Sequence, residues 1–169
     1  RADPKPTEAA GLVAVTGSRG APGTSEIALA LAWGMAEQNQ RTLLIDLDRS
    51  CLSLSVRLGI TPAPDVAHAA DAVLLSRALP PSVRKVGPLN LLAGPPAHRA
   101  GPLTTALVNE VLQAAEGSFQ RIVVDLGVGQ RHEAPVLFPG CIVDLLEESH
   151  LTVEITQVYL AHGKAPTFM

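Results

Sequence analysis

The sequence predicts an α/β fold in which helices cover both faces of a mostly parallel sheet. Short apolar runs alternate with helical stretches along the chain, as they do in βαβ units. The apolar runs are continuous rather than alternating, which is typical of parallel strands buried on both faces. A glycine-rich turn at residues 16–23 joins the first run to the first helix. Free backbone N–H groups and the helix dipole make such a turn an anion-binding site.

The first three elements follow from this pattern. A strand is expected at residues 12–15, four apolar residues that lead into the glycine-rich turn. A helix is expected at residues 25–40, because its apolar residues recur every three to four positions. The second strand is expected at residues 42–45, a continuous run that ends at Asp46.

The rest of the chain continues the alternation, with helical periodicity in some segments and β-branched apolar runs in others. The remaining elements are expected, in chain order, as helices at residues 52–58 and 65–79, a strand at 89–92, a helix at 104–115 and strands at 122–124 and 151–159.

Composition excludes several classes of protein. The 169 residues are 47% hydrophobic, which suits one domain with a substantial core, and the formal net charge of −3 gives no strong nucleic-acid or membrane signal. No apolar run approaches the ~20 residues of a membrane-spanning helix. Two cysteines, Cys51 and Cys141, are too few for a disulfide framework, so reduced thiols and a cytoplasmic location are expected.

Acidic residues and glycines gather where the predicted strands end. Ligands of parallel α/β sheets bind at the carboxyl ends of the strands. The residues expected there, besides the glycine-rich turn, are Asp46, Asp48, Gly94 and Asp125.

The turn resembles the deviant Walker A motif of the ParA/MinD family of P-loop ATPases, a lysine followed by Gly-Gly-x-Gly-Lys-Thr-Thr. On this chain the motif runs Arg19-Gly20-Ala21-Pro22-Gly23-Thr24-Ser25-Glu26. Asp48 follows Thr24 by 24 residues, the interval usual in that family. The segment ending in Asp46 and Asp48 resembles the family's Walker A′ motif, and residues 122–127 resemble its Walker B motif leading into switch II. Residues 58–65 resemble the CpaE/TadZ-like branch associated with pilus assembly.

This resemblance implies a P-loop NTPase domain with ATP and Mg²⁺ as cofactors. Asp48 and Arg19 take the catalytic roles, and Ser25, Asp46 and Asp125 hold the magnesium ion. The nucleotide cradle implied by the motif comprises Ser18, Arg19, Gly20, Ala21, Pro22, Gly23, Thr24, Ser25 and Glu26. It further implies a nucleotide-dependent homodimer with polar, septal or pilus-assembly proteins as partners. The function implied is spatial positioning of chromosomes, plasmids, septa or pilus machinery.

The motif departs from the family pattern where charge matters most. Thr24 replaces the phosphate-binding lysine, Arg19 replaces the signature lysine, and Ala21 replaces a glycine. A charge-assisted hydrogen bond contributes roughly 1.5–3 kcal/mol, so its loss lowers nucleotide affinity about ten- to hundredfold. Hydrolysis is therefore expected to be weak or lost, and whether the chain is an enzyme stays open. A non-hydrolysing localisation scaffold with the same fold is the alternative.

A second resemblance is to the Thr-Gly-x-x-x-Gly-x-Gly turn of short-chain dehydrogenases, over residues 16–23. Asp46 would then bind the adenosine ribose of NAD(P). That family requires a lysine four residues after a tyrosine. Here Gly163 stands four residues after Tyr159, the only tyrosine, which makes this the weaker alternative.

Three regions are expected along the chain. Residues 1–10 are polar and proline-bearing, as a linker would be. Residues 11–160 form the P-loop NTPase-like domain, which is expected to be incomplete at its C-terminus because relatives continue through further strands. Residues 161–169 form an irregular tail.

Overall fold

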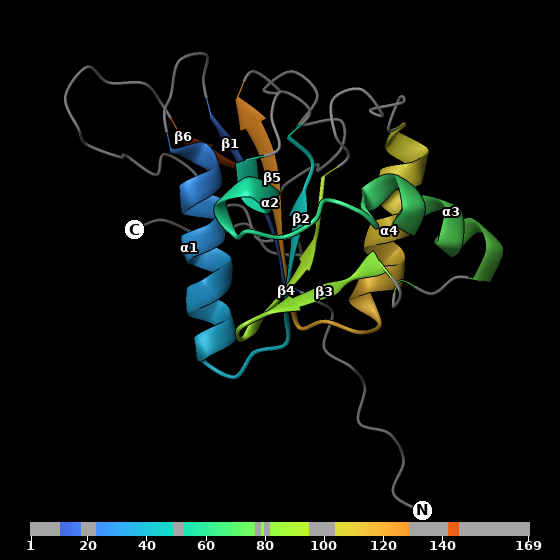
Figure 1. The fold of residues 1–169 in the computed structure, drawn as a ribbon, viewed down its shortest axis with the longest axis horizontal. Helices are drawn as coiled ribbons and strands as arrows, with labels where there is room; N and C mark the ends of the chain where they lie inside the picture. The colour runs from blue at the N-terminus through green and yellow to red at the C-terminus, as the bar shows by residue number, and fades with distance from the viewer. Residues whose placement is uncertain are drawn as a thin grey trace, which may run out of the picture.

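The computed structural model describes residues 11–17, 23–48, 53–76, 79, 82–94, 104–128 and 142–145. These residues form a six-stranded sheet in the order β3-β4-β2-β5-β1-β6 (Figure 1). The strands are β1 (Gly11–Gly17), β2 (Thr42–Asp46), β3 (Arg84–Val86), β4 (Leu89–Leu92), β5 (Arg121–Val128) and β6 (Ile142–Leu145). The helices are α1 (Thr24–Glu37), α2 (Ser53–Arg57), α3 (Val66–Ser76) and α4 (Thr105–Glu116).

Every neighbouring pair of strands is parallel except β3 and β4, which pair antiparallel. The predicted α/β class with a mostly parallel sheet is therefore confirmed. The predicted strand at residues 151–159 lies outside the described residues. Two strands were not predicted. β3 is a three-residue edge strand containing two cations, and β6 lies before the segment that was expected to form the last strand.

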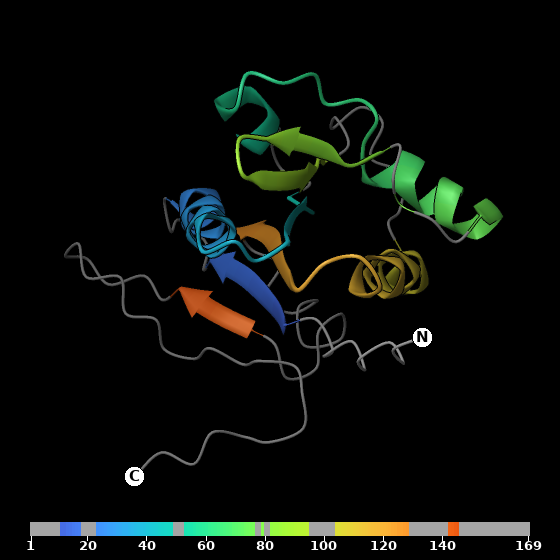
Figure 2. The ribbon, with the colours of Figure 1, turned by 90° about the horizontal axis from the view of Figure 1, so that it is seen from below.

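The helices form two layers, one on each face of the sheet (Figure 2). One hydrophobic core lies on each face of the sheet, and successive residues of β2 point into opposite cores because side chains alternate across a strand. Leu43 and Ile45 pack with buried residues of α3 and α4, whereas Leu44 packs with buried residues of α1 and α2. Helices on both faces explain why the central strands are continuously apolar.

A stripe of small residues lets α1 approach the sheet closely. Ser25, Ala28, Ala32 and Ala36 recur every three to four residues on the buried side of the helix. The helix ends at Glu37, before the predicted residue 40, and Asn39 then takes a left-handed backbone conformation with φ of 59°. Alanines on the buried face bring the first turn of α1 against the strand ends.

The strand order corrects the dehydrogenase alternative. In a dinucleotide-binding sheet the first two strands are neighbours. Here β5 lies between β1 and β2 and pairs with both. The NAD(P)-binding interpretation of the glycine-rich turn is therefore wrong.

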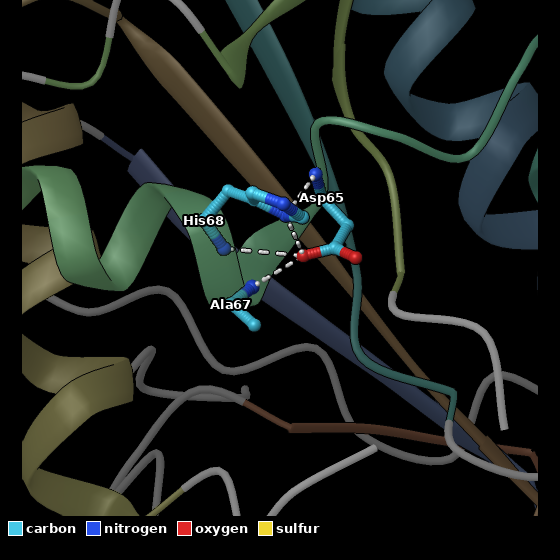
Figure 3. Close-up of polar contacts among 3 residues, drawn as sticks. All are labelled: Asp65, Ala67 and His68. Carbon is cyan, nitrogen blue, oxygen red and sulfur yellow. Dashed lines mark hydrogen bonds and ion pairs between the residues drawn. The ribbon is translucent and has the colours of Figure 1, made fainter. Parts of the chain in front are cut away.

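A buried carboxylate fixes the start of α3 (Figure 3). Asp65 Oδ1 accepts hydrogen bonds from the backbone N–H groups of Ala67 and His68 at 2.9 and 3.1 Å, and His68 Nδ1 lies 2.9 Å from the same oxygen. The backbone N–H of Val66 donates to the carbonyl of Ala93 at 2.8 Å, directly after β4. These contacts attach α3 to the end of β4. None of the helices in the described ranges is long and apolar enough to cross a membrane.

The Asp65 cap yields a stability prediction. Asp65→Ala should lower the free energy of unfolding by about 2 kcal/mol, because it leaves two N–H groups of a buried helix start without their acceptor. Thr104→Ala is the matched control. It removes a longer and exposed cap at α4, from Thr104 Oγ1 to the N–H of Leu107 at 3.3 Å, and should cost about 0.5–1 kcal/mol. Urea unfolding measures both, and equal losses would contradict the structural role given to Asp65.

Candidate functional site

Two buried aspartates lie side by side at the carboxyl end of the sheet. The register of β2 and β5 pairs Asp46 with Asp125, and the register of β1 and β5 pairs Val15 with Asp125. Both aspartates are fully buried. Asp48 follows two residues after Asp46 and is also buried. The sheet topology therefore gathers the three predicted aspartates at one edge.

The N-terminus of α1 lies at the same edge. Gly23 precedes the helix in a left-handed conformation with φ of 93° and, as a glycine, provides no side-chain cap for the first turn. The first N–H groups of a helix have no partner within the helix. The N-terminus of a helix favours negative charge, because its N–H groups and the helix dipole point at the ligand.

Thr24 is the first residue of α1. Its side chain is buried, and its Oγ1 has no hydrogen-bond partner among the described residues. A buried hydroxyl without a partner costs free energy. Thr24 therefore supplies a neutral hydrogen-bonding group at this helix start and no positive charge.

Asp125 connects the helix start to the sheet. Its Oδ1 accepts a hydrogen bond from the N–H of Gly127 at 2.9 Å. Burial raises the pKa of Asp125, the Ser25 hydroxyl and the Gly127 N–H oppose that rise by hydrogen bonding to the carboxylate, and the charges of Asp48 and Glu26 add to it. Oδ2 has no hydrogen-bond partner among the described residues.

Asp46 is the most strongly perturbed carboxyl group of the site. Burial, followed by the neighbouring charge of Asp125, raises the pKa of Asp46 to about 8. Its Oδ1 accepts a hydrogen bond from the backbone N–H of Asp48 at 3.0 Å, while Oδ2 has no partner within the described residues. Asp46 is therefore largely protonated at neutral pH when no cation lies beside it.

Two glycines make room for these carboxylates. A Cβ at Gly127 would lie 2.5 and 2.7 Å from the two carboxylate oxygens of Asp48, and a Cβ at Gly94 would lie 3.0 Å from Cγ of Asp46. Gly127 also has φ of 66°, in the left-handed region. Any side chain at Gly127 would displace Asp48.

The donor set fits a magnesium ion that completes its shell with phosphate and water. Mg²⁺ in nucleotide sites takes one or two carboxylates together with phosphate oxygens and waters. The two orphaned oxygens, Asp46 Oδ2 and Asp125 Oδ2, and the Ser25 hydroxyl beside Asp125 are hard oxygen donors of that kind. Among the described residues, no group of three or more His, Cys, Asp or Glu side chains is placed to hold a metal ion.

The structure brings together seven of the predicted site residues, namely Gly23, Thr24, Ser25, Glu26, Asp46, Asp48 and Asp125. The other five, Ser18, Arg19, Gly20, Ala21 and Pro22, lie outside the described residues. Sequence reasoning missed Arg57, which forms an ion pair with Glu26. No sequence signal marks that pairing, because it joins two helices that follow different strands.

The fold is that of the ParA/MinD-like P-loop NTPases. The chain superposes on a ParA family ATPase from Chlorobium tepidum with a TM-score of 0.63 at 20% identity, covering 82% of this chain and 60% of that one. It superposes on the septum site-determining protein MinD from Pyrococcus horikoshii, solved with Mg-ADP, with a TM-score of 0.52 at 17% identity over 68% and 48% of the two chains. It superposes on the kinase domain of the Escherichia coli tyrosine kinase ETK with a TM-score of 0.64 at 16% identity, covering 80% of this chain and 54% of that one.

The chain thus spans about 60% or less of the length of these three structures. No family model matches the sequence, and no curated protein matches it either. The similarity is therefore one of fold, and the chemistry of the site has to be argued from this chain's own residues.

The raised pKa of Asp46 makes stability depend on pH. Between about pH 4 and pH 8 the folded chain holds a proton at Asp46 that the unfolded chain has lost, so the free energy of unfolding falls as pH rises through this window. The slope from one such group reaches about 1.4 kcal/mol per pH unit. Asp46→Asn keeps the acceptor for the Asp48 N–H and should flatten the curve. Urea unfolding at several pH values checks this, with the exposed Asp71→Asn as control. An unchanged slope in Asp46→Asn would contradict the assignment.

Gly127 gives a second prediction. Gly127→Ala should lower the free energy of unfolding by about 1–3 kcal/mol, because alanine is strained in the left-handed backbone conformation of residue 127 and its Cβ would displace the Asp48 carboxylate. Gly34→Ala is the control. Gly34 lies within α1, and a Cβ there meets nothing within 4 Å, so alanine should stabilise the chain by about 0.4–1 kcal/mol. Thermal and urea unfolding should therefore show a lower free energy of unfolding for Gly127→Ala and a higher one for Gly34→Ala.

Proposed function

We propose that this chain binds ATP with Mg²⁺ at the N-terminus of α1 and that its hydrolysis of ATP is weak or lost. One observation carries the proposal. Two buried carboxylates, Asp46 and Asp125, each leave an oxygen without a partner beside an uncapped helix start. Each feature favours a ligand of opposite charge, since a cation stabilises buried carboxylates and an anion stabilises the N-terminus of a helix. A magnesium–nucleotide complex supplies both.

The proposed roles follow from the contacts. The N–H groups of the first turn of α1 bind phosphate oxygens. Ser25, Asp46 and Asp125 would hold Mg²⁺, directly or through water, and the chemistry that the ion would supply is neutralisation of phosphate charge. The carboxylate of Asp125 orients the Ser25 hydroxyl. Asp48 is the proposed positioner of the attacking water, and the small volume of Gly127 lets its carboxylate lie at the strand ends.

The weak hydrolysis rests on Thr24. Phosphoryl transfer depends on fixed positive charge that stabilises the transferred group. Thr24 offers a neutral hydroxyl there. Arg19 remains the proposed second catalytic residue, since it keeps a charge at the signature position. Nucleotide binding is compatible with this arrangement, whereas efficient turnover is not.

We further propose a role in spatial positioning, with a nucleotide-dependent homodimer in the cytoplasm and polar, septal or pilus-assembly proteins as partners. The fold supports the general kind, because it is shared with a ParA family ATPase and with MinD. The fold does not indicate which cellular process the chain serves, because a tyrosine kinase domain has the same fold. The likeness of residues 58–65 to the CpaE/TadZ-like branch favours pilus machinery. A non-hydrolysing localisation scaffold is the form of this function that Thr24 favours.

Calorimetric titration with Mg-ATP and Mg-ADP tests the proposal. The chain should bind both, and removal of Mg²⁺ should weaken binding. Thr24→Lys should bind about ten- to hundredfold more tightly, because it restores a charge-assisted hydrogen bond. Asp125→Asn should lose most of the Mg²⁺ dependence, whereas Glu116→Gln, which removes an exposed acid at the end of α4, should not.

Hydrolysis is measured on the same variants. If only Thr24→Lys turns over ATP, the natural chain is a scaffold that binds nucleotide. If neither the natural chain nor Thr24→Lys binds nucleotide in the presence of Mg²⁺, the proposed function is wrong.

A further inference from the structure

Arg57 lies at the N-terminal end of α1, although it belongs to a different helix. It is the last residue of α2, and its guanidinium forms an ion pair with Glu26 in the first turn of α1. Leu54, three residues earlier and fully buried, packs with the alanines of α1. Residues three apart share a helix face, so the anchoring of Leu54 places Arg57 beside the head of α1.

The carboxylate that holds Arg57 lies at the proposed phosphate site. Glu26 Oε2 is 4.0 Å from the position that a Cβ would take at Gly23, the residue before the uncapped first turn. The charge of Glu26 also acts on Asp125. Glu26 therefore adds a fourth acidic group to the edge that carries Asp46, Asp48 and Asp125.

An acidic edge of this kind repels phosphate unless cations are present. Thr24 supplies none, and its buried Oγ1 and the buried Oδ2 of Asp125 both lack partners among the described residues, as expected of groups that await a ligand. Arg57 brings a permanent positive charge to the same helix end. Its side chain is 46% exposed, so it can move to a bound anion without unpacking the core.

Building on the proposed function, we propose that Arg57 supplies the nucleotide phosphates with the positive charge that Thr24 lacks, and that its ion pair with Glu26 positions Arg57 for this role. A guanidinium has five N–H donors in a planar fork. It can therefore bind a phosphate while keeping a hydrogen bond to Glu26. In this proposal α2 supplies the positive charge that is missing at position 24.

A purely structural role for the ion pair makes a different prediction. If Arg57 only neutralises Glu26, its removal would still weaken nucleotide binding, because an unpaired Glu26 would repel phosphate. The two roles separate once Glu26 is neutral. In a Glu26→Gln background, a structural Arg57 no longer affects binding, whereas a phosphate-binding Arg57 still does.

The experiment is a double-mutant cycle on the natural chain, with Mg-ADP as the probe in isothermal titration calorimetry. The four chains are the natural sequence, Glu26→Gln, Arg57→Gln and the double variant. We expect Glu26→Gln to bind more tightly than the natural chain. We expect Arg57→Gln to weaken binding about tenfold or more in the Glu26→Gln background. Arg57→Lys in that background should retain part of the affinity, since lysine keeps the charge but not the fork.

Arg41→Gln in the same background is the matched control. Arg41 is exposed, and its backbone carbonyl accepts from the N–H of Gln120 at the opposite end of the sheet, so the variant removes one positive charge far from the site. It should change the affinity by less than about twofold, because exposed charges at that distance are screened. Circular dichroism and melting temperature confirm that each variant is folded.

Each outcome decides one question. A large loss from Arg57→Gln in the Glu26→Gln background supports the proposal. An equal affinity with and without Arg57 in that background overturns it and leaves the proposed function intact. If none of the four chains binds Mg-ADP, the proposed function fails and this inference fails with it.

Discussion

The parallel pairing of β2 with β5 places Asp46 opposite Asp125, and the rest of the site depends on that pairing. Two carboxyl groups buried side by side cannot both ionise without compensation, because burial and mutual repulsion disfavour the second charge. Protonation of Asp46 is the compensation available in the free chain. A bound cation would be the alternative compensation. A sheet with two buried carboxyl groups at the carboxyl ends of its strands therefore favours the binding of a cation there.

The remaining architecture brings the proposed anion site, the N-terminus of α1, to the same place. Because β5 lies between β1 and β2, Asp125 lies on a central strand that pairs with both. The alanines on the buried face of α1 allow close packing, and Ser25, on the same stripe, reaches the Asp125 carboxylate. Gly94 and Gly127 leave the space that the acidic side chains fill. The proposed cation and anion sites thus share one edge of the sheet, which is the requirement for binding a metal–phosphate complex.

Local pattern was enough to predict the central strands and the acidic residues at their ends, because strands buried on both faces have a continuous apolar signature. It could not predict β3, whose residues Arg84 and Lys85 look like a solvated turn and become a strand only by pairing with β4. It could not predict the insertion of β5 either, since strand order depends on contacts between distant segments. The same holds for Arg57, which meets Glu26 only because Leu54 docks α2 on α1.

In the proposed function, the neutral side chain of Thr24 would affect nucleotide binding and turnover differently. Binding needs positive charge near the phosphates in the bound state, and a half-exposed arginine on a neighbouring helix can supply it after a rearrangement. Turnover needs a positive charge that is already held where negative charge develops in the transition state. Moving a mobile group into place at that moment raises the barrier. A charge carried on the surface of α2 meets the first requirement better than the second. The arrangement of Thr24, Glu26 and Arg57 therefore fits a chain that responds to nucleotide as a ligand more than one that consumes it.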